Sequence, residues 1–153
     1  MKGNKEMAEK KKKFLLVVAD FYPDLTDMLA IGAKRIIMQY KHDWDRVLVP
    51  GALEIPPTIK YAAAKFDAFV ALGVVIRGET SHYDLVCNES ARGLMDLGVR
   101  DGLAIGNGIV TAENEAQARE RCDPEGEDKG GAAAGAAHLL EHSRRHYGFQ
   151  KKT

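Results

Sequence analysis

Cysteine is scarce in this chain, and that scarcity excludes two kinds of site. Only two of the 153 residues are cysteine, Cys87 and Cys122, and they do not form a C-x-x-C pair. Small secreted domains are dense in cysteine, and many structural metal sites combine cysteines at short spacing. The sequence therefore indicates reduced thiols in a cytoplasmic protein, rather than a disulfide framework or a cysteine-based metal site.

Long apolar runs and an excess of charge of either sign are also absent. A membrane-spanning helix needs ~20 apolar residues, whereas the apolar run after the lysine-rich start covers only residues 14–19. That run is also too short for a secretory signal, and Asp20 ends it without a small-residue cleavage site. Basic and acidic residues number 22 each, so we expect neither a nucleic acid nor a membrane as a partner.

Positive charge gathers only at the two ends of the chain, where lysines crowd residues 2–13 and 151–152. We expect residues 1–13 to form a basic, disordered and solvated N-terminal arm, in preference to an arm that contacts nucleic acid. The remaining residues, 14–153, suffice for a single domain with a hydrophobic core, and no repeat or linker divides them.

Short apolar runs alternate with longer amphipathic segments, which is the pattern of a parallel sheet covered by helices. Strands are expected at residues 14–19, 47–49 and 68–76 and from residue 103 onward. Helices are expected from Pro23 onward and at residues 54–65, 80–97, 113–121 and 130–147. Right-handed crossovers would give an α/β three-layer sandwich with a four-stranded parallel sheet, of the flavodoxin-like type.

Open parallel sheets bind ligands beyond the carboxyl ends of their strands. Three segments follow directly after expected strands: residues 20–22, 50–54 and 77–82. The strand at 68–76 is the most hydrophobic, so its end should lie near the middle of that edge. We therefore expect the functional site to be built from these three segments.

The segment from Arg77 to His82 joins the central strand to a helix. Backbone N–H groups around Glu79 to Ser81 would be free donors at the helix N-terminus, which suits a phosphate or another anion. Thr80 or Ser81 could equally be a plain N-cap, and the two interpretations are compatible. His82 falls in the first turn, where an imidazole could take and return a proton, although a lone histidine is more often structural.

Two further patterns are weaker evidence of function. Gly106-Asn107-Gly108 lacks the third glycine of a dinucleotide fingerprint, and no glycine-lysine-serine phosphate loop is present. His138, His142 and His146 recur at the four-residue spacing of metal ligands. They also stand near the end of a helix among arginines, where positive groups complement the helix dipole, and we favour that structural interpretation.

Four segments carry a specific pattern in a fixed order. They are residues 49–56 (VPGALEIP), 72–91 (LGVVIRGETSHYDLVCNESA), 108–118 (GIVTAENEAQA) and 120–130, from Glu120-Arg121 to Lys129-Gly130. In order and spacing they resemble the lumazine synthase family over most of the chain from residue 14 to about 141. The arginine-glycine-x-threonine-x-histidine core is the most specific of these motifs.

The resemblance implies an enzyme that condenses 5-amino-6-(D-ribitylamino)uracil with 3,4-dihydroxy-2-butanone 4-phosphate. The products would be 6,7-dimethyl-8-ribityllumazine, phosphate and water, formed without a metal or organic cofactor. Family members build the active site between adjacent subunits of a homopentamer. Two alternatives are a catalytically idle flavin- or lumazine-binding assembly protein and a flavodoxin-like electron carrier. The carrier would need a Ser/Thr-rich loop directly after the first strand, where this chain has residues 20–23 (DFYP).

The resemblance also implies a role for individual residues. His82 would be the general acid and base that moves protons during imine formation and phosphate loss. The uracil and ribityl side would be bound by Phe21, Ala52, Leu53, Glu54, Val74, Val75, Ile76 and Asn107. The phosphate side would be bound by Gly78, Glu79, Thr80, Arg121 and Lys129.

Three segments depart from the family pattern. Residues 20–22 replace an arginine-phenylalanine-asparagine sequence, and Asn107 occupies a usually apolar position that a neighbouring subunit supplies. Residues 122–128 (CDPEGED) replace a loop that is usually rich in glycine and lysine. Because Pro124 stiffens this loop and its carboxylates should repel wherever pentamers meet, we expect a free pentamer, or a pair of pentamers, rather than an icosahedral shell.

Overall fold

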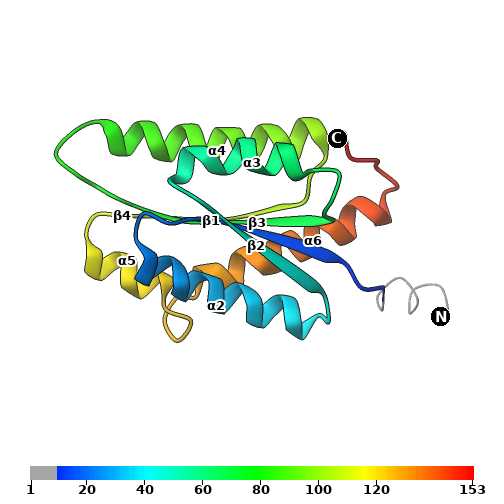
Figure 1. The fold of residues 1–153 in the computed structure, drawn as a ribbon, viewed down its shortest axis with the longest axis horizontal. Helices are drawn as coiled ribbons and strands as arrows, with labels where there is room; N and C mark the ends of the chain where they lie inside the picture. Colours follow the sequence, from blue (N-terminus) through cyan, green and yellow to red (C-terminus); the bar gives the residue numbers. More distant parts are fainter. Residues whose placement is uncertain (1–9) are drawn as a thin grey trace.

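The computed structural model describes residues 10–153, in which four strands pair in parallel in the order β2-β1-β3-β4 (Figure 1). The strands are β1 (Lys13–Ala19), β2 (Asp43–Val49), β3 (Ala68–Ile76) and β4 (Ile105–Ala112). Each strand is joined to the next along the chain by a segment that contains a helix, as parallel pairing requires. The predicted parallel sheet is confirmed, with β3 in an inner position.

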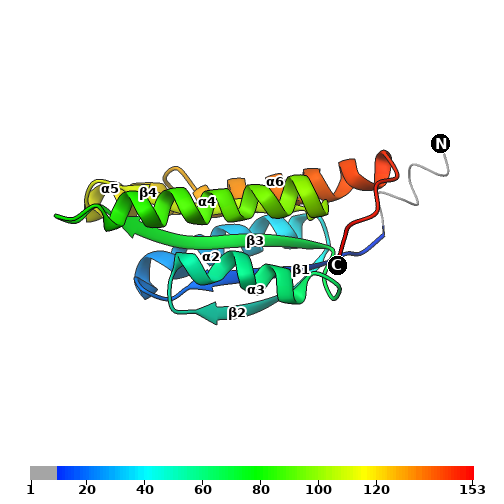
Figure 2. The ribbon, with the colours of Figure 1, turned by 90° about the horizontal axis from the view of Figure 1, so that it is seen from above.

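Helices cover both faces of this sheet. Figures 1 and 2 show α3 and α4 on one face and α2, α5 and α6 on the other, so the predicted three-layer α/β sandwich is also confirmed. The bounds are α2 (Pro23–Gln39), the short 3₁₀ helix η1 (Ala52–Glu54), α3 (Ile55–Ala62), α4 (His82–Asp101), α5 (Glu115–Cys122) and α6 (Lys129–His146). None of the helices formed by residues 10–153 is long and apolar enough to cross a membrane.

Strand β1 has an apolar face on each side of the sheet, so helices can pack on both sides. Its side chains alternate, so Phe14, Leu16 and Val18 join the core beneath α2 and α6, while Leu15 and Val17 join the core beneath α3 and α4. Phe14, Leu16, Val17 and Val18 are at most 1% exposed. Full burial of each such side chain contributes roughly 1.5–3 kcal/mol. A strand buried on both faces must be apolar throughout, which is why it is visible as an uninterrupted run in the sequence.

Strand β2 begins earlier than the apolar pattern predicted. It starts at Asp43 rather than Val47, and its first residues pair with residues 13–16 of β1. The missed residues, Asp43 to Arg46, are mostly charged. β2 is an edge strand, so charged side chains can reach solvent there, and hydrophobic periodicity alone does not reveal them.

The amino end of the domain lies slightly before the predicted boundary at residue 14. Lys13 is the first residue of β1, and its N–H donates to Asp67 Oδ2 at 2.9 Å. Lys12 is only 8% exposed, with its ammonium 3.9 Å from the carboxylate of buried Glu141. Residues 1–9 of the predicted arm lie outside the described residues.

The glycine pair in β4 serves packing. A Cβ built on Gly106 would lie 1.8 Å from the carbonyl oxygen of Ala133 in α6, and a Cβ on Gly108 would lie 2.8 Å from Ala71 O. Both positions therefore require glycine for the close approach of α6 and β3 to β4. This packing explains the Gly-Asn-Gly sequence without a nucleotide.

A polar cluster lies at the amino ends of β1 and β2, opposite the edge where a ligand is expected. His42 Nδ1 accepts a hydrogen bond from the Lys12 N–H at 3.0 Å, so its Nε2 carries the proton shared with His138 Nδ1 at 3.2 Å. Tyr40 stacks on the His138 ring with centroids 3.6 Å apart. His138 thus pairs with a residue from another element, and residues 10–153 hold no group of three side chains suited to a metal ion.

Both imidazoles of this pair favour the neutral form. Burial lowers the pKa of His42, and the neighbouring His138 lowers it further. Burial likewise lowers the pKa of His138, against the opposing influence of Glu141. Glu141 is itself 2% exposed, and its carboxylate accepts from Arg145 Nε at 2.8 Å, so that charge is already neutralised by a partner.

Acidification should destabilise the fold through this histidine pair. Below about pH 6.5 the unfolded chain takes up protons that the folded pair resists, so the free energy of unfolding falls as the pH falls toward the lowered pKa values. Well above that pH both histidines are neutral in the folded and the unfolded chain, so the pair no longer lowers the free energy of unfolding. His138→Gln should flatten the fall in urea midpoint between about pH 7.5 and about pH 5.5, and the exposed control His146→Gln should not. Equal slopes in all three proteins would contradict this account.

Candidate active site

The carboxyl ends of β1, β2 and β3 border a cavity of about 550 Å³. All three segments predicted for the site contribute to it. It is lined by Phe21, Tyr22, Pro50, Gly51, Ala52, Leu53, Glu54, Val74, Val75, Ile76, Gly78, Thr80, His82, Tyr83 and Val86. Ten of the fourteen residues that the sequence singled out therefore face one space, which we call the ring cavity.

An aromatic side chain and the end of β3 form apolar walls of the ring cavity. Phe21 follows β1, is 69% exposed and meets Tyr22 edge to face, with ring centroids 4.9 Å apart. The backbone here is fixed because the N–H of Asp20 donates to Val49 O at 2.8 Å. One face of the Phe21 ring is thus available to a flat heterocycle, which aromatic rings bind by stacking.

The segment after β2 begins with a 3₁₀ turn and contains a shorter α-helix than predicted. A helix was expected from Glu54 to residue 65, whereas residues 52–54 form the 3₁₀ turn η1 and α3 runs from Ile55 to Ala62. Prolines at the start of α3 leave no N–H groups that would need a partner there. Glu54 N–H donates to Gly51 O at 3.2 Å, and this turn presents Ala52 to Glu54 to the ring cavity.

The helix that carries His82 begins without a side-chain cap from Ser81. His82 is the first residue of α4, and its N–H donates to Thr80 Oγ1 at 3.3 Å. Thr80 thus supplies a side-chain oxygen to this turn, and the anion-binding interpretation remains compatible with that contact. A Cβ on Gly78 would meet nothing within 4 Å, so the chain does not need glycine there for its own packing.

Arg77 holds this loop in place, a role that the sequence did not reveal. Its Nε donates to Glu113 Oε2 at 2.7 Å, its guanidinium lies 4.3 Å from the Tyr83 ring centroid, and NH1 is 3.7 Å from Asp84 Oδ1. The hydrogen bond that Arg77 donates to Glu113 raises the pKa of Arg77. Arg77 and Glu113 are 36 residues apart, so only the pairing of β3 with β4 brings them together.

Neither cysteine is suited to act as a nucleophile. Burial raises the pKa of Cys87, and burial raises that of Cys122 to about 11. Both thiols are therefore protonated near neutral pH, whereas the thiolate is the reactive form. Proton transfer by His82, without a cysteine adduct, is the chemistry that the ring cavity can support.

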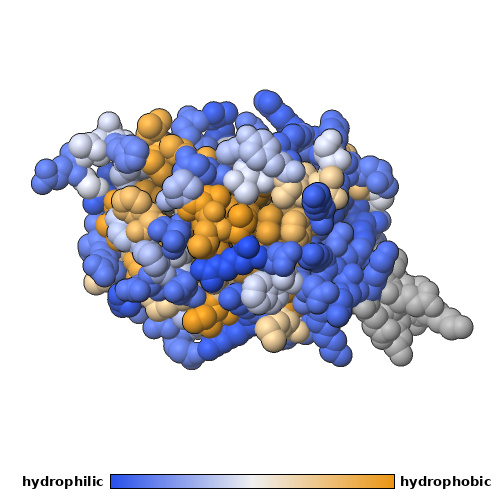
Figure 3. Space-filling view, in the orientation of Figure 1, coloured by the Kyte–Doolittle hydropathy of each residue, from blue (hydrophilic) through white to orange (hydrophobic). Residues whose placement is uncertain are grey.

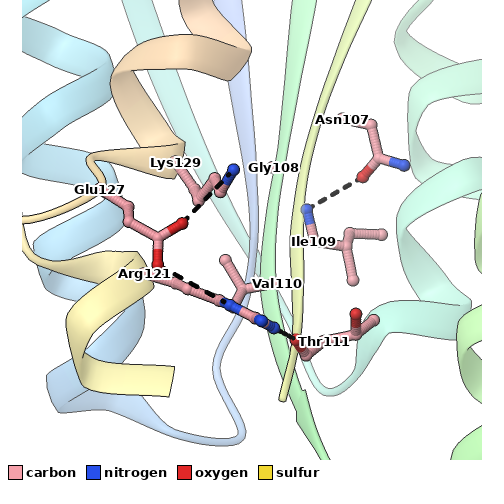
Figure 4. Close-up of a pocket in the computed structure, with 8 residues that line it drawn as sticks. All are labelled: Asn107, Gly108, Ile109, Val110, Thr111, Arg121, Glu127 and Lys129. Carbon is pink, nitrogen blue, oxygen red and sulfur yellow. Dashed lines mark hydrogen bonds and ion pairs between the residues drawn. The ribbon is translucent and has the colours of Figure 1, made fainter. Parts of the chain in front are cut away.

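A second cavity, of about 290 Å³, lies along β4, and we call it the cation cavity. Figure 4 shows Arg121, Glu127 and Lys129 on one side of the strand and the Asn107 side chain on the other. Arg121 NH1 donates to Thr111 O, and Asn107 Oδ1 accepts from the Ile109 N–H at 2.9 Å. The cavity is lined by Asn107, Gly108, Ile109, Val110, Thr111, Arg121, Glu127 and Lys129.

The predicted site residues are thus divided within one chain. Asn107, Arg121 and Lys129 line the cation cavity, although Asn107 was predicted for the uracil side. The other residues predicted for the uracil side line the ring cavity together with His82, Gly78 and Thr80. Glu79 is exposed and lines neither cavity. One surface can receive a flat ring beside an imidazole, and the other offers cations suited to an anion.

Fold and cavities together define an α/β sandwich protein with a cavity at the carboxyl edge of a parallel sheet, where proteins of this class bind ligands. Residues 11–144 match the family model described as 6,7-dimethyl-8-ribityllumazine synthase, and the chain belongs to that family. The expectation of a transferase from this family is confirmed.

Curated relatives carry the same description. A 6,7-dimethyl-8-ribityllumazine synthase from Novosphingobium aromaticivorans is 56% identical over 130 residues, which cover 84% of this chain and 93% of that protein. One from Zymomonas mobilis subsp. mobilis is 58% identical over 127 residues, covering 82% and 91%. The 6,7-dimethyl-8-ribityllumazine synthase 1 of Rhizobium meliloti is 49% identical over 144 residues, covering 90% and 94%.

Proposed function

We propose that this chain condenses 5-amino-6-(D-ribitylamino)uracil with 3,4-dihydroxy-2-butanone 4-phosphate to form 6,7-dimethyl-8-ribityllumazine, phosphate and water. This is the penultimate step of riboflavin biosynthesis. The observation that carries the proposal is the ring cavity, where segments 21–22, 50–54 and 74–86 converge beside His82 in a member of this family. Purified protein mixed with both substrates should release the fluorescent lumazine faster than the substrates react alone.

The ring cavity suits the uracil substrate. Its heterocycle would stack on Phe21 and lie against the end of β3 at Val74 to Ile76, while Ala52 to Glu54 would hold the ring edge and ribityl chain. His82 would relay protons as the amine forms an imine and as phosphate leaves. The substrates supply both the electrophile and the leaving group, so alignment and proton transfer suffice without a cofactor.

The phosphate would bind where two subunits meet. Gly78, Glu79 and Thr80 would offer backbone N–H groups, and Arg121 and Lys129 would approach from the cation cavity of a neighbouring chain. Asn107 would come from the same neighbour. Contact between two different surfaces of identical chains is heterologous, and such contacts close into a ring when the rotation allows. The family resemblance supports a ring of five subunits.

Exposed apolar side chains support the proposed ring. Figure 3 shows an apolar patch across the middle of the face on which β2 crosses the view. Leu48 of β2 is 53% exposed, and Met95 and Val99 of α4 are 64% and 73% exposed. Apolar patches on a protein surface commonly mark an interface between proteins, and the exposed apolar side chains of α4 form a separate surface from that of β2.

We also propose that the enzyme is cytoplasmic and that its pentamer is free. Cys87 and Cys122 are unpaired thiols, the form that a reducing compartment maintains. The charge repulsion expected around residues 122–128 is reduced by partners within the chain, since Glu125 contacts Arg35 at 3.1 Å. Pro124 and its effect on Asp123 therefore remain the main argument for a free pentamer.

Replacing the imidazole should slow catalysis without removing substrate binding. His82→Ala should lower kcat by about 10²–10⁴-fold, the usual contribution of one acid–base group, although the spontaneous reaction reduces the observed difference. His142→Ala, on an exposed part of α6, is the matched control. An unchanged kcat in His82→Ala, after subtraction of the uncatalysed rate, would remove His82 from the mechanism.

Removing the guanidinium should weaken binding of the phosphate-bearing substrate. Arg121→Ala should chiefly raise the KM for the butanone phosphate, with a loss of about 2–5 kcal/mol if the pair is well desolvated. Arg119→Ala is the control on the same helix, because Arg119 pairs with Glu115 at 3.5 Å in solvent. A change confined to the KM of the uracil substrate would show that the phosphate role is wrong.

Light scattering at physiological salt tests the assembly. A particle of five chains supports the free pentamer. A megadalton particle would contradict the argument from Pro124 while leaving the ring intact, and an active monomer would contradict an active site shared between subunits.

A further inference from the structure

Glu127 lies between the two cations predicted to bind phosphate. Its Oε2 is 4.0 Å from Arg121 Nε, and its Oε1 is 3.7 Å from Lys129 Nζ (Figure 4). The Glu127 side chain is 44% exposed, so it can turn toward solvent without breaking the core. An anion of the protein thus already occupies the space between these cations.

Backbone hydrogen bonds of the loop between α5 and α6 place Glu127 beside the two cations. Glu127 N–H donates to Glu120 O at 3.0 Å, and Asp128 N–H donates to Asp123 O at 3.1 Å. Asp128 then caps α6 by accepting from Gly131 N–H at 3.1 Å. These bonds fix the position of residue 127 without using its side chain.

The guanidinium of Arg121 and the backbone of Lys129 are positioned by contacts that do not involve Glu127. Arg121 extends from α5 and donates through NH1 to the Thr111 carbonyl oxygen on the open edge of β4. Lys129 is the first residue of α6, whose start is capped by Asp128. Removing the Glu127 charge therefore removes an anion from the cavity, while the contacts that hold the Arg121 guanidinium and the start of α6 remain.

We propose that Glu127 is an internal competitor for the anion site of the cation cavity and so sets the affinity of that site for phosphate. This inference rests on the proposed function, which assigns Arg121 and Lys129 to the substrate phosphate. A half-exposed ion pair at 3.7–4.0 Å is weak and readily displaced. A phosphate with a charge of about −1.5 to −2 displaces a single carboxylate but is repelled while that carboxylate stays near.

The competition has a consequence for turnover. Inorganic phosphate is released from the same site that binds the phosphate of the substrate, so a resident carboxylate that returns to the cations favours release of the product anion. If Glu127 instead organised the two cations for the ligand, its removal would weaken phosphate binding. The two roles therefore predict changes of opposite sign.

Titration of the purified, assembled protein with inorganic phosphate, followed by calorimetry at fixed ionic strength, measures the effect directly. Glu127→Gln should lower the Kd for phosphate about 1.5- to 5-fold, the range that corresponds to one exposed ion pair. Glu125→Gln is the matched control, because it removes the same charge from the same loop while Glu125 contacts Arg35 at 3.1 Å. It should leave the Kd unchanged.

Three outcomes would overturn the proposal: an unchanged or raised Kd in Glu127→Gln, an equal fall in both variants, or no phosphate binding by either Glu127→Gln or the parent protein. In the enzyme assay, Glu127→Gln should lower the KM for the butanone phosphate, leave the KM for the uracil substrate unchanged, and strengthen inhibition by phosphate. If the parent protein formed no lumazine, the proposed function would fail, while the calorimetric comparison would still decide the role of Glu127.

Discussion

Burial of β1 and β3 on both faces is the constraint on which the rest of this structure depends. The two strands pair in parallel from Phe14 with Ala68 to Val18 with Leu72, and residues on both are almost fully buried. Parallel pairing turns the carboxyl ends of all four strands toward one edge, since every strand runs the same way. The segments that begin at Asp20, Pro50 and Arg77 meet at that edge for this reason alone.

The open edge of β4 links the stability of the sheet to the proposed chemistry. An edge strand leaves backbone groups without a partner strand. Here Arg121 satisfies the Thr111 carbonyl and Asn107 satisfies the Ile109 N–H. A guanidinium proposed to bind phosphate is thus held by the backbone of the fold, and the same open edge carries the cation cavity that a neighbouring ring cavity could meet.

Polar side chains at the two ends of the strands differ in whether they have partners within the chain. At the amino ends, His42 bonds to His138 and to the backbone of Lys12, and buried Glu141 accepts from Arg145 and lies 3.9 Å from the Lys12 ammonium. Polar groups at the carboxyl ends, such as His82 and Glu79, are instead exposed, and the proposed function places the ligand and a neighbouring chain there. Charged groups that bond fully within the chain stabilise it, whereas those left open can bind substrate.

The sequence by itself determined the fold class, the inner strands and the segments of the ring cavity. Strand β3 has the predicted bounds because a strand buried on both faces is an unbroken apolar run, and the motif after it, which contains His82, identified the family. Periodicity missed the charged half of β2, since solvent at a sheet edge tolerates charge. Only the tertiary structure decided that Arg121 lies apart from His82 within one chain, that His138 pairs with His42, and that Glu127 lies between two cations. These contacts join residues from different elements, and their distances depend on packing that no local pattern encodes.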